Sequence, residues 1–128
     1  MSKDWYQDIV EFHKEVMLDS FSTTPNIPFP KYVALRHRLI KEEVGETLEA
    51  IEDENLVELA DGICDSIVVL LGTAVTYGID IRPIWDEVHR TNMAKGDGVL
   101  REDGKRLKPE GWKPPRVAKL LKEQGYES

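Results

Sequence analysis

The sequence feature that most constrains the fold is the run from Leu56 to Tyr77, which is apolar around most of a helical circumference. A helix that is apolar on nearly every side is buried at the centre of an all-α protein, and Gly78 is a natural C-terminal stop for it. Three acids interrupt the pattern, and because they fall at i, i+3 and i+7 they share one narrow sector: Glu58, Asp61 and Asp65. A buried carboxylate is costly unless it is paired or bound to a metal, so this sector predicts a cation site.

A second acidic helix comes directly before this run. Helical periodicity from Lys31 to about Glu54 puts Glu43 and Glu46 on a face whose other members are apolar, and residues 53–55 supply a turn and a cap. If the two helices fold back on each other, five carboxylates converge, and any two of them about 4 Å apart repel by about 4 kcal/mol at an effective dielectric constant of about 20. Such a cluster requires cations, and oxygen ligands suit Mg²⁺ or Mn²⁺. The alternative is a solvated face with salt bridges.

The remaining chain is predicted to add shorter helices at about 4–18, 80–95 and 115–125. Residues 19–30 hold three prolines and form a long loop, and the pair Asp103-Gly104 predicts a hairpin. The helix that begins near residue 80 is predicted to bury a face of Ile81, Ile84, Trp85 and Val88, and Asn92 and Lys95 extend that face. They indicate either a site at that end or a lysine that reaches solvent beside a capping asparagine.

Length and composition exclude several classes of protein. The 128 residues predict one domain, 1–128, and the net charge of −7 argues against broad nucleic-acid binding, which needs a basic surface. Cys64, the single cysteine, lies in an apolar run and is interpreted as a small core residue. The first residues do not resemble a signal peptide, and the longest apolar run, residues 66–77, is too short to span a bilayer. We therefore expect a soluble cytoplasmic protein without a membrane partner.

The order of the acidic motifs resembles a known family. E-E-x-x-E at residues 42–46, followed about a dozen residues later by E-x-x-D at residues 58–61, resembles the MazG-like all-α nucleoside triphosphate pyrophosphohydrolases. The segments DSIVVLLGTAVTYGIDIRPIWDEVHRTNMAK and DGKRLKPEGWKPP look like the small single-domain branch related to phosphoribosyl-ATP pyrophosphohydrolase, which is often found in bacteria and phages. The similarity covers about residues 12–115.

The resemblance implies an all-α bundle of four main helices with a C-terminal hairpin or extended arm over about 97–128, assembled as a dimer or a dimer of dimers. It implies Mg²⁺-dependent cleavage of a (d)NTP between the α- and β-phosphates, with Mn²⁺ as a substitute. The expected location is the cytoplasm, or the cytoplasm of the host if the chain is phage-encoded. The metal ligands that the motif implies are Glu43, Glu46, Glu58 and Asp61, with Asp65 one turn further on. Asn92 and Lys95 match an Asn-x-x-Lys segment that contacts the nucleotide.

The chemistry expected of these residues is consistent with that reaction. Triphosphate cleavage needs charge neutralisation on the phosphates and a positioned water, and either Glu43 or Glu46 is the candidate to take the proton of that water. Trp5, Phe12 and His13 are candidates to stack on the base, with core packing as the alternative for each. The sequence does not fix the base, and dGTP or GTP is the first substrate to test.

Three other functions are consistent with part of the pattern. One is hydrolysis of phosphoribosyl-ATP in histidine synthesis. Another is a di-iron carboxylate bundle, which normally uses Glu-x-x-His pairs, and the sequence has none. The last is a non-enzymatic helical interaction protein, which would gain no stability from divalent metal.

Overall fold

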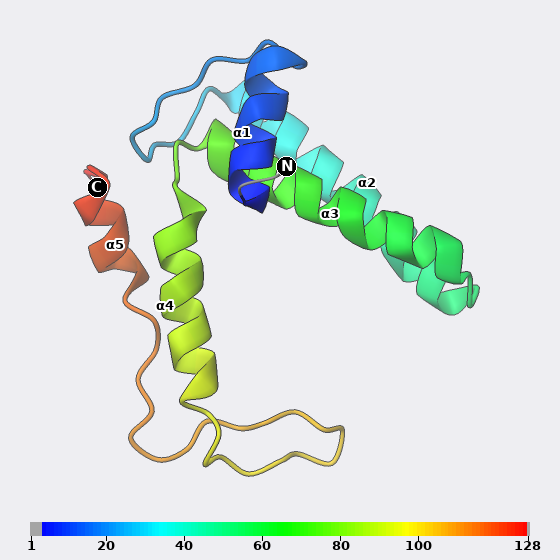
Figure 1. Ribbon diagram of the computed structural model, residues 1–128, viewed down its shortest axis with the longest axis vertical. Coiled ribbons are helices and arrows are strands. Elements are labelled where there is room, and N and C mark those ends of the chain that lie inside the picture. Colours follow the sequence, from blue (N-terminus) through cyan, green and yellow to red (C-terminus); the bar gives the residue numbers. More distant parts are fainter. Residues whose placement is uncertain (1–3, 128) are drawn as a thin grey trace. The chain divides into compact units, whose positions relative to one another are not determined.

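The computed structural model describes residues 4–127, and within that range the chain is all-helical, with five helices and no strand. The chain divides into two compact units, with the boundary between Asp80 and Ile81. The helices, drawn in Figure 1, are α1 (Trp5–Glu15), α2 (Pro30–Glu52) and α3 (Leu56–Thr76) in the first unit and α4 (Ile81–Met93) and α5 (Val117–Glu123) in the second. Every predicted helix is present. The single domain and the bundle arrangement stay predictions.

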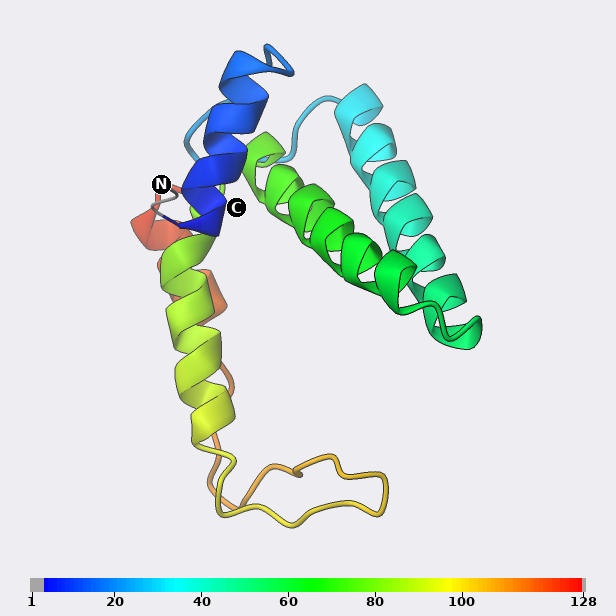
Figure 2. The same cartoon turned by 45° about the vertical axis from the view of Figure 1, so that its right-hand side comes forward.

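Helices α2 and α3 form an antiparallel hairpin and lie side by side in Figures 1 and 2. The chain reverses at residues 53–55, where Glu54 adopts a φ of 53°. The Asn55 side chain accepts a hydrogen bond from the backbone N–H of Glu58 at 3.1 Å and so caps α3. Across the hairpin, the hydroxyls of Thr47 and Ser66 hydrogen-bond at 3.1 Å. The predicted break and cap are confirmed, and they place the acidic residues of both helices in the half of the hairpin nearest the turn.

A buried arginine connects α2 to α3 in the other half of the hairpin. Arg36 is 6% exposed. Its Nη2 donates to the carbonyl oxygen of Val69 at 2.7 Å and its Nε to the hydroxyl of Thr73 at 3.1 Å. Burial lowers the pKa of the Arg36 guanidinium, and the negative charge of Asp19 opposes that shift. Because an arginine stays protonated in proteins, this guanidinium is a buried positive charge beside α3.

Helix α1 is held beside the same point by a histidine. His13 is 4% exposed, and its Nδ1 lies 3.0 Å from Oδ2 of Asp19. Its other ring nitrogen faces Gly72, where a Cβ atom would come within 2.7 Å of His13 Nε2 and 2.5 Å of Arg36 Nη2. Only glycine leaves room for both side chains at this point of α3. The core of the first unit therefore contains a polar cluster where three helices meet.

The C-terminal end of α3 anchors the long loop. Gly78 has a φ of 72°, and the N–H of Ile79 bonds the carbonyl oxygen of Ala74 at 2.9 Å, as in a Schellman ending. A Cβ at Gly78 would lie 2.4 Å from the carbonyl oxygen of Thr24. The N–H of Asn26 bonds the carbonyl oxygen of Tyr77 at 2.9 Å. The predicted end of the helix at Gly78 is confirmed. The same residues also hold the loop of residues 19–30 against the end of α3.

The described chain leaves much of the apolar surface of α2 and α3 uncovered, although the sequence predicts a central α3 that is buried on nearly every side. Helix α1 packs against α3, and Tyr6 of α1 donates a hydrogen bond at 2.9 Å to the carbonyl oxygen of Ile79, just beyond the C-terminal end of α3. The large apolar side chains that stay exposed in the rest of the hairpin are Val44, Leu48, Ile51, Leu56, Val57, Ile63 and Leu70. Cys64 is also exposed, so its interpretation as a core residue is wrong.

Helix α3 as a whole is long and apolar enough to cross a membrane by length and composition, unlike the shorter run considered in the sequence. The central helix of a soluble protein passes the same test. Helix α3 carries acids near its N-terminal end, at Glu58, Asp61 and Asp65, which is where a spanning helix would need apolar residues. A soluble protein stays the expectation.

The second unit is organised by a buried glutamate on α4. Glu87 is 8% exposed, and it accepts hydrogen bonds from Arg90 Nε at 2.8 Å and from the backbone N–H of Arg116 at 2.7 Å. These bonds hold the pKa of the Glu87 carboxyl far below its usual range. Since Arg116 directly precedes α5, they fix α5 against α4. The predicted apolar face of α4 is only partly right, because Ile84 is buried while Trp85 is 69% exposed.

The segment between α4 and α5 contains the predicted hairpin in minimal form. Leu100 and Arg106 make an isolated antiparallel bridge, and the N–H of Arg101 bonds the carbonyl oxygen of Lys105 at 2.7 Å. Asp103 accepts hydrogen bonds from the Arg101 guanidinium inside the turn. The turn is therefore confirmed, but its arms are too short to count as strands.

Candidate functional site

Glu43 on α2 has the most unusual environment among the described carboxylates. Its Oε2 atom is buried and has no hydrogen-bond partner in the part of the chain that the structure describes. Burial raises the pKa of the Glu43 carboxyl, and the negative charges of Glu46, Asp65, Glu42 and Asp61 raise it further. The charges of Asp61 and Asp65 on α3 thus act on the same carboxyl as those of α2. Acids of both helices therefore lie near enough to Glu43 to act on its carboxyl, and the convergence of all five carboxylates stays a prediction.

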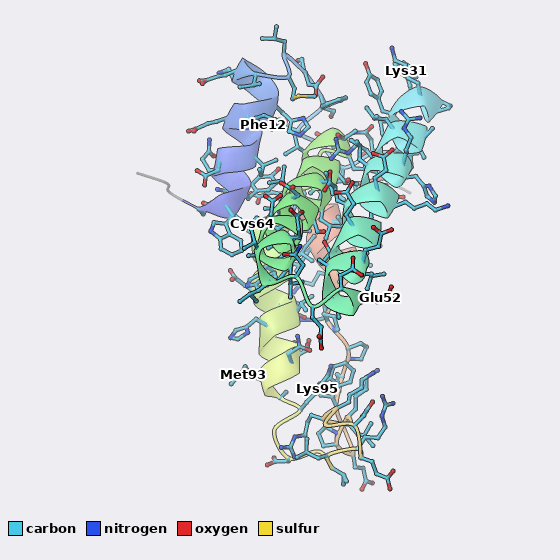
Figure 3. All side chains as sticks on the ribbon, turned by 90° about the vertical axis from the view of Figure 1, so that its right-hand side faces the viewer. Phe12, Lys31, Glu52, Cys64, Met93 and Lys95 are labelled. Carbon is cyan, nitrogen blue, oxygen red and sulfur yellow. The ribbon has the colours of Figure 1, made fainter. Side chains whose placement is uncertain are left out.

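The other predicted ligands differ in their exposure. Asp65 is half-buried, whereas Glu46, Glu58 and Asp61 are exposed. The expectation that all five acids are turned inward is therefore wrong for those three. The physical reason within the first unit is that α1 makes its contacts away from the turn, since His13 lies beside Gly72 and Tyr6 bonds Ile79. Figure 3 shows the turn half of the hairpin from its end, with Glu52 and Cys64 labelled. Periodicity predicted that the acids share a side, and that side is open to water.

The donor set of these acids matches a hard divalent cation. All the candidate ligand atoms are carboxylate oxygens, which Mg²⁺ and Mn²⁺ prefer. Oε2 of Glu43 has no hydrogen-bond partner among the described residues, so it could accept a cation. Within residues 4–127, no three His, Cys, Asp or Glu side chains are already close enough to hold an ion. The residues present fit such an ion by their chemistry, and binding it would require the exposed side chains of Glu46 and Asp61 to turn toward Glu43.

Asn92 and Lys95 belong to a separate polar cluster in the second unit. Lys95 Nζ donates to Oδ1 of Asn92 at 3.0 Å and lies 5.2 Å from the ring centroid of Trp112. Lys108 Nζ lies 4.8 Å from the same ring centroid. The indole N–H of Trp112 donates to the carbonyl oxygen of Thr91 at 2.7 Å, which orients the ring. The ring of Trp112 thereby holds two ammonium groups close to each other through cation–π contacts. Such a pair of positive charges can bind phosphate oxygens.

Lys108 and Trp112 were not identified from the sequence. A signal was available in KPEGWKPP, where an aromatic residue stands among lysines and prolines. Helical periodicity gives no information on this segment, because the segment is extended. Its contact with α4 joins residues that are far apart in the sequence, so no local pattern predicts it.

The three residues predicted to stack on a base lie in different environments. Trp5 is 66% exposed. Phe12 is partly exposed and packs edge-on against His13, which is itself buried and bonded to Asp19. For His13 the structure thus supplies the hydrogen-bonded neighbour expected of a core histidine. Contact of these three with a base stays a prediction.

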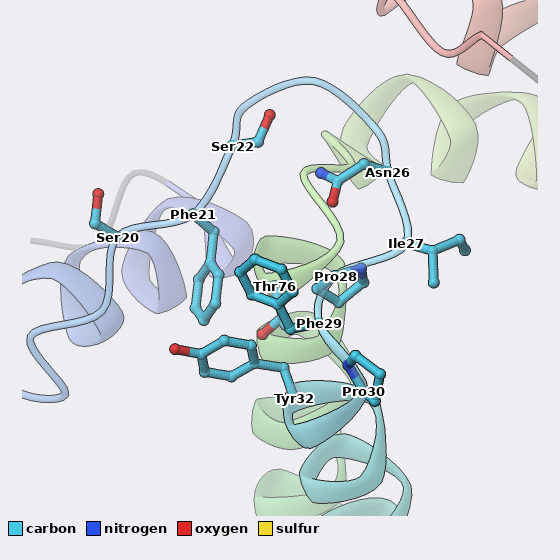
Figure 4. A pocket seen from close by; sticks show the side chains of 10 residues that line it. All are labelled: Ser20, Phe21, Ser22, Asn26, Ile27, Pro28, Phe29, Pro30, Tyr32 and Thr76. Carbon is cyan, nitrogen blue, oxygen red and sulfur yellow. The ribbon is translucent and has the colours of Figure 1, made fainter.

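None of those three side chains lines the pocket that the predicted loop forms. This open pocket, of about 470 Å³, is lined by residues of the loop between Ser20 and Pro30 together with Tyr32 and Thr76 (Figure 4). The Phe21 and Tyr32 rings meet edge to face at 5.1 Å between centroids. Aromatic rings and prolines of this kind can hold a flat apolar group.

Most of the chain matches the model of one protein family. The family model described as phosphoribosyl-ATP pyrophosphohydrolase matches residues 10–92. The chain belongs to this family. The matched range contains Glu43, Glu46, Glu58, Asp61 and Asp65 and ends at Asn92, so Lys95 and Trp112 lie outside it.

An uncharacterized protein of Acanthamoeba polyphaga mimivirus is similar to the chain, with 34% identity over 84 residues. The alignment covers 59% of the chain and 32% of the viral protein, so the chain spans about a third of that relative's length. The family is described as a pyrophosphohydrolase family, and its members generally depend on a divalent metal.

Proposed function

We propose that the protein is a metal-dependent nucleotide pyrophosphohydrolase that cleaves a (d)NTP between its α- and β-phosphates. The observation that supports this most directly is the buried, unpartnered oxygen of Glu43 among the negative charges of Glu46, Asp61 and Asp65. A group of acids in this state gains stability from a cation, and the family to which the chain belongs acts on a phosphate anhydride.

Glu43, Glu46, Glu58 and Asp61, with Asp65, would hold Mg²⁺ or Mn²⁺. The bound cation would supply charge neutralisation on the phosphates and a lower pKa for water. Glu46 or Glu43 accepts the proton of the attacking water as its oxygen bonds to phosphorus. The bond from that phosphorus to the bridging oxygen breaks, and the products are a nucleoside monophosphate and pyrophosphate. Asn92 and Lys95 are proposed to donate hydrogen bonds to the nucleotide.

The test is a product assay on the full chain with the eight common (d)NTPs, beginning with dGTP and GTP, in Mg²⁺ or Mn²⁺. We expect pyrophosphate and the matching monophosphate from at least one substrate. Glu46→Gln and Asp61→Asn should each abolish turnover without loss of helix content, measured by circular dichroism. Glu49→Gln, an equal change on the exposed side of α2, is the control. A fully active Glu46→Gln, Asp61→Asn double variant would end this assignment.

Phosphoribosyl-ATP is the second candidate substrate, because the matched family model carries that name. The same assay with phosphoribosyl-ATP distinguishes the two, since each substrate yields its own monophosphate. Turnover of phosphoribosyl-ATP alone would place the protein in histidine synthesis. If no substrate is cleaved and Mn²⁺ does not raise the melting temperature, a non-enzymatic helical interaction protein becomes the better account.

We also propose that a second copy of the chain covers the exposed apolar side of α2 and α3, as a dimer or a dimer of dimers in the cytoplasm. Leu56 and Val57 are 78% and 79% exposed, and Ile63 is 46% exposed, more apolar surface than a monomer usually leaves in one region. Sedimentation equilibrium should give twice or four times the chain mass. Ile63→Lys should shift the mass toward the monomer, whereas Lys14→Gln on exposed α1 surface should not. A monomeric wild type at high concentration would contradict this proposal.

A further inference from the structure

We propose that the second unit carries a binding site for a polyphosphate anion, formed by Arg90, Lys113 and Arg116. The three side chains, with Pro114, line a hollow of about 450 Å³ next to the start of α5. None of the acids of α2 and α3 takes part in this site, so it does not depend on the proposed catalytic function.

The two guanidinium groups are already oriented for a ligand. Arg90 uses Nε and Nη2 on the Glu87 carboxylate, at 2.8 and 3.0 Å, and Arg116 uses Nε, at 3.1 Å. In the described part of the chain, this leaves Nη1 of Arg90 and both Nη atoms of Arg116 without a protein partner. The side chains are 56% and 62% exposed, so the remaining N–H groups are open to solvent. A guanidinium fixed in this way loses little entropy when it forms paired hydrogen bonds to phosphate oxygens.

The charge at the hollow favours an anion with at least two negative charges. Three cationic side chains line it, and the Glu87 carboxylate offsets one of them. The ammonium group of Lys113 makes no hydrogen bond or ion pair within residues 4–127. Pro114 and Pro115 connect Lys113 to Arg116 and restrict the backbone between them. The lysine and the arginine are therefore held on one short, stiff segment.

The distribution of charge along the chain points the same way. Residues 1–80 contain six Lys and Arg against sixteen Asp and Glu, whereas residues 81–128 contain eleven against eight. Residues 81–128 therefore carry a net positive charge, although the net charge of the whole chain is −7. A small polyanion would be repelled by the first unit and attracted to the second. The hollow suits a chain of two or three phosphates, either free or as part of a nucleotide.

The experiment is a titration of the full-length protein with pyrophosphate in low salt and EDTA. EDTA keeps divalent cations from the acids of α2 and α3, so phosphate cannot bind there through a metal. Two-dimensional NMR of the arginine Nε–H groups should show saturable shifts for Arg90 and Arg116. Calorimetry should show about tenfold weaker binding for Lys113→Gln. Lys119→Gln removes an equal charge from the neighbouring hollow and should change the affinity by less than twofold.

Further titrations distinguish a free phosphate chain from a nucleotide as the bound anion. They also distinguish this site from the proposed catalytic site. Tripolyphosphate and a nucleoside triphosphate are titrated in parallel. Equal affinity for both indicates that the phosphate chain alone is recognised, and tighter binding of the nucleotide identifies a nucleotide as the occupant. Glu46→Gln should leave pyrophosphate affinity unchanged, so failure of the catalytic proposal would not affect this result.

Several results would overturn the site. These are unshifted arginine Nε–H signals at saturating pyrophosphate, equal losses in Lys113→Gln and Lys119→Gln, or a single-stranded RNA that binds a hundredfold more tightly than pyrophosphate. If Lys113→Gln does not fold, Lys113→Arg should bind pyrophosphate as the wild type does. The arginine shifts of the wild type then decide.

Discussion

The contact of Gly72 with Arg36 and His13 gives a prediction whose size follows from the structure. In Gly72→Ala the new Cβ would lie 2.5 Å from Arg36 Nη2 and 2.7 Å from His13 Nε2, so the guanidinium must move. It then loses its 2.7 Å hydrogen bond to Val69, and a hydrogen bond from a charged group contributes about 1.5–3 kcal/mol. Overpacking strain adds about 1 kcal/mol. Because alanine has a higher helix propensity than glycine, the substitution also stabilises α3 by about 1 kcal/mol.

The net expectation for Gly72→Ala is a loss of about 2 kcal/mol in the free energy of unfolding, since the helix gain offsets only part of the cost. At about 4 °C per kcal/mol this lowers the melting temperature by about 8 °C. Gly45→Ala on α2 is the matched control, because no atom lies within 4 Å of its would-be Cβ. That variant should gain up to about 1 kcal/mol from helix propensity.

The assay is urea unfolding followed by circular dichroism at one fixed protein concentration for all variants. A double-mutant cycle with Arg36→Met locates the cause, because a flexible, uncharged side chain can move away from the new Cβ at little cost. In that background Gly72→Ala should cost much less than in the wild type. The reasoning is refuted if Gly72→Ala stabilises the protein as Gly45→Ala does, or if the Arg36→Met background leaves its cost unchanged.

Three further outcomes are expected. Hydrogen bonds from Arg90 and Arg116 hold the pKa of Glu87 in the folded protein far below its ordinary value of 4.5. The stability that this carboxylate gives to the contact between α4 and α5 should therefore be complete above about pH 4.5, decline below it, and be lost as the pH falls through the lowered pKa. Acid titration by NMR of the Arg116 backbone N–H checks this, and Glu87→Gln should remove the pH dependence. Mn²⁺ at about a hundred times its dissociation constant should stabilise the protein by about 2.7 kcal/mol over EDTA. This gain should vanish in Glu43→Gln and persist in Glu49→Gln, and an equal gain in both variants would contradict the metal assignment. Gly78 has a φ of 72°, and a Cβ there would also meet Thr24, so Gly78→Ala should lower the free energy of unfolding by more than about 1 kcal/mol. Calorimetry measures this, and an unchanged melting temperature would disprove the role of Gly78 in holding the loop.

The local parts of the fold were predictable from the sequence. Apolar periodicity fixed the helices within a few residues, and Asn55 and Gly78 marked a start and a stop by their own backbone chemistry. The pair Asp103-Gly104 predicted its turn in the same way. Each of these features is decided by residues that are neighbours in the chain, so no knowledge of tertiary contacts was needed.

Burial was much less predictable. Helical spacing predicted that Glu43, Glu46 and Asp61 are all turned inward, but of these three only Glu43 is partly buried, while Glu46 and Asp61 are exposed. Cys64 and Trp85, placed in the core by their apolar neighbours, are exposed. A helical period tells which residues lie together on a face. What covers that face depends on distant segments or on other molecules.

The polar clusters were missed for a related reason. Arg36 stands three and four positions from Val33 and Ile40 on an apolar stripe, which was a visible sign of a buried charge. Its partners on α3 and the space provided by Gly72 are thirty and more residues away in the sequence. Trp112 gathers Lys95 and Lys108 by a similar distant contact with α4.

The uncovered side of the α2–α3 hairpin has a consequence for how the protein would behave at different abundances. If a second copy supplies the missing cover, the free energy of the folded first unit includes a term that depends on the logarithm of protein concentration. Diluted molecules would lose secondary structure and turnover together, and specific activity would fall rather than stay constant. In a cell, the amount synthesised would then set the active fraction of the protein as well as the number of its molecules.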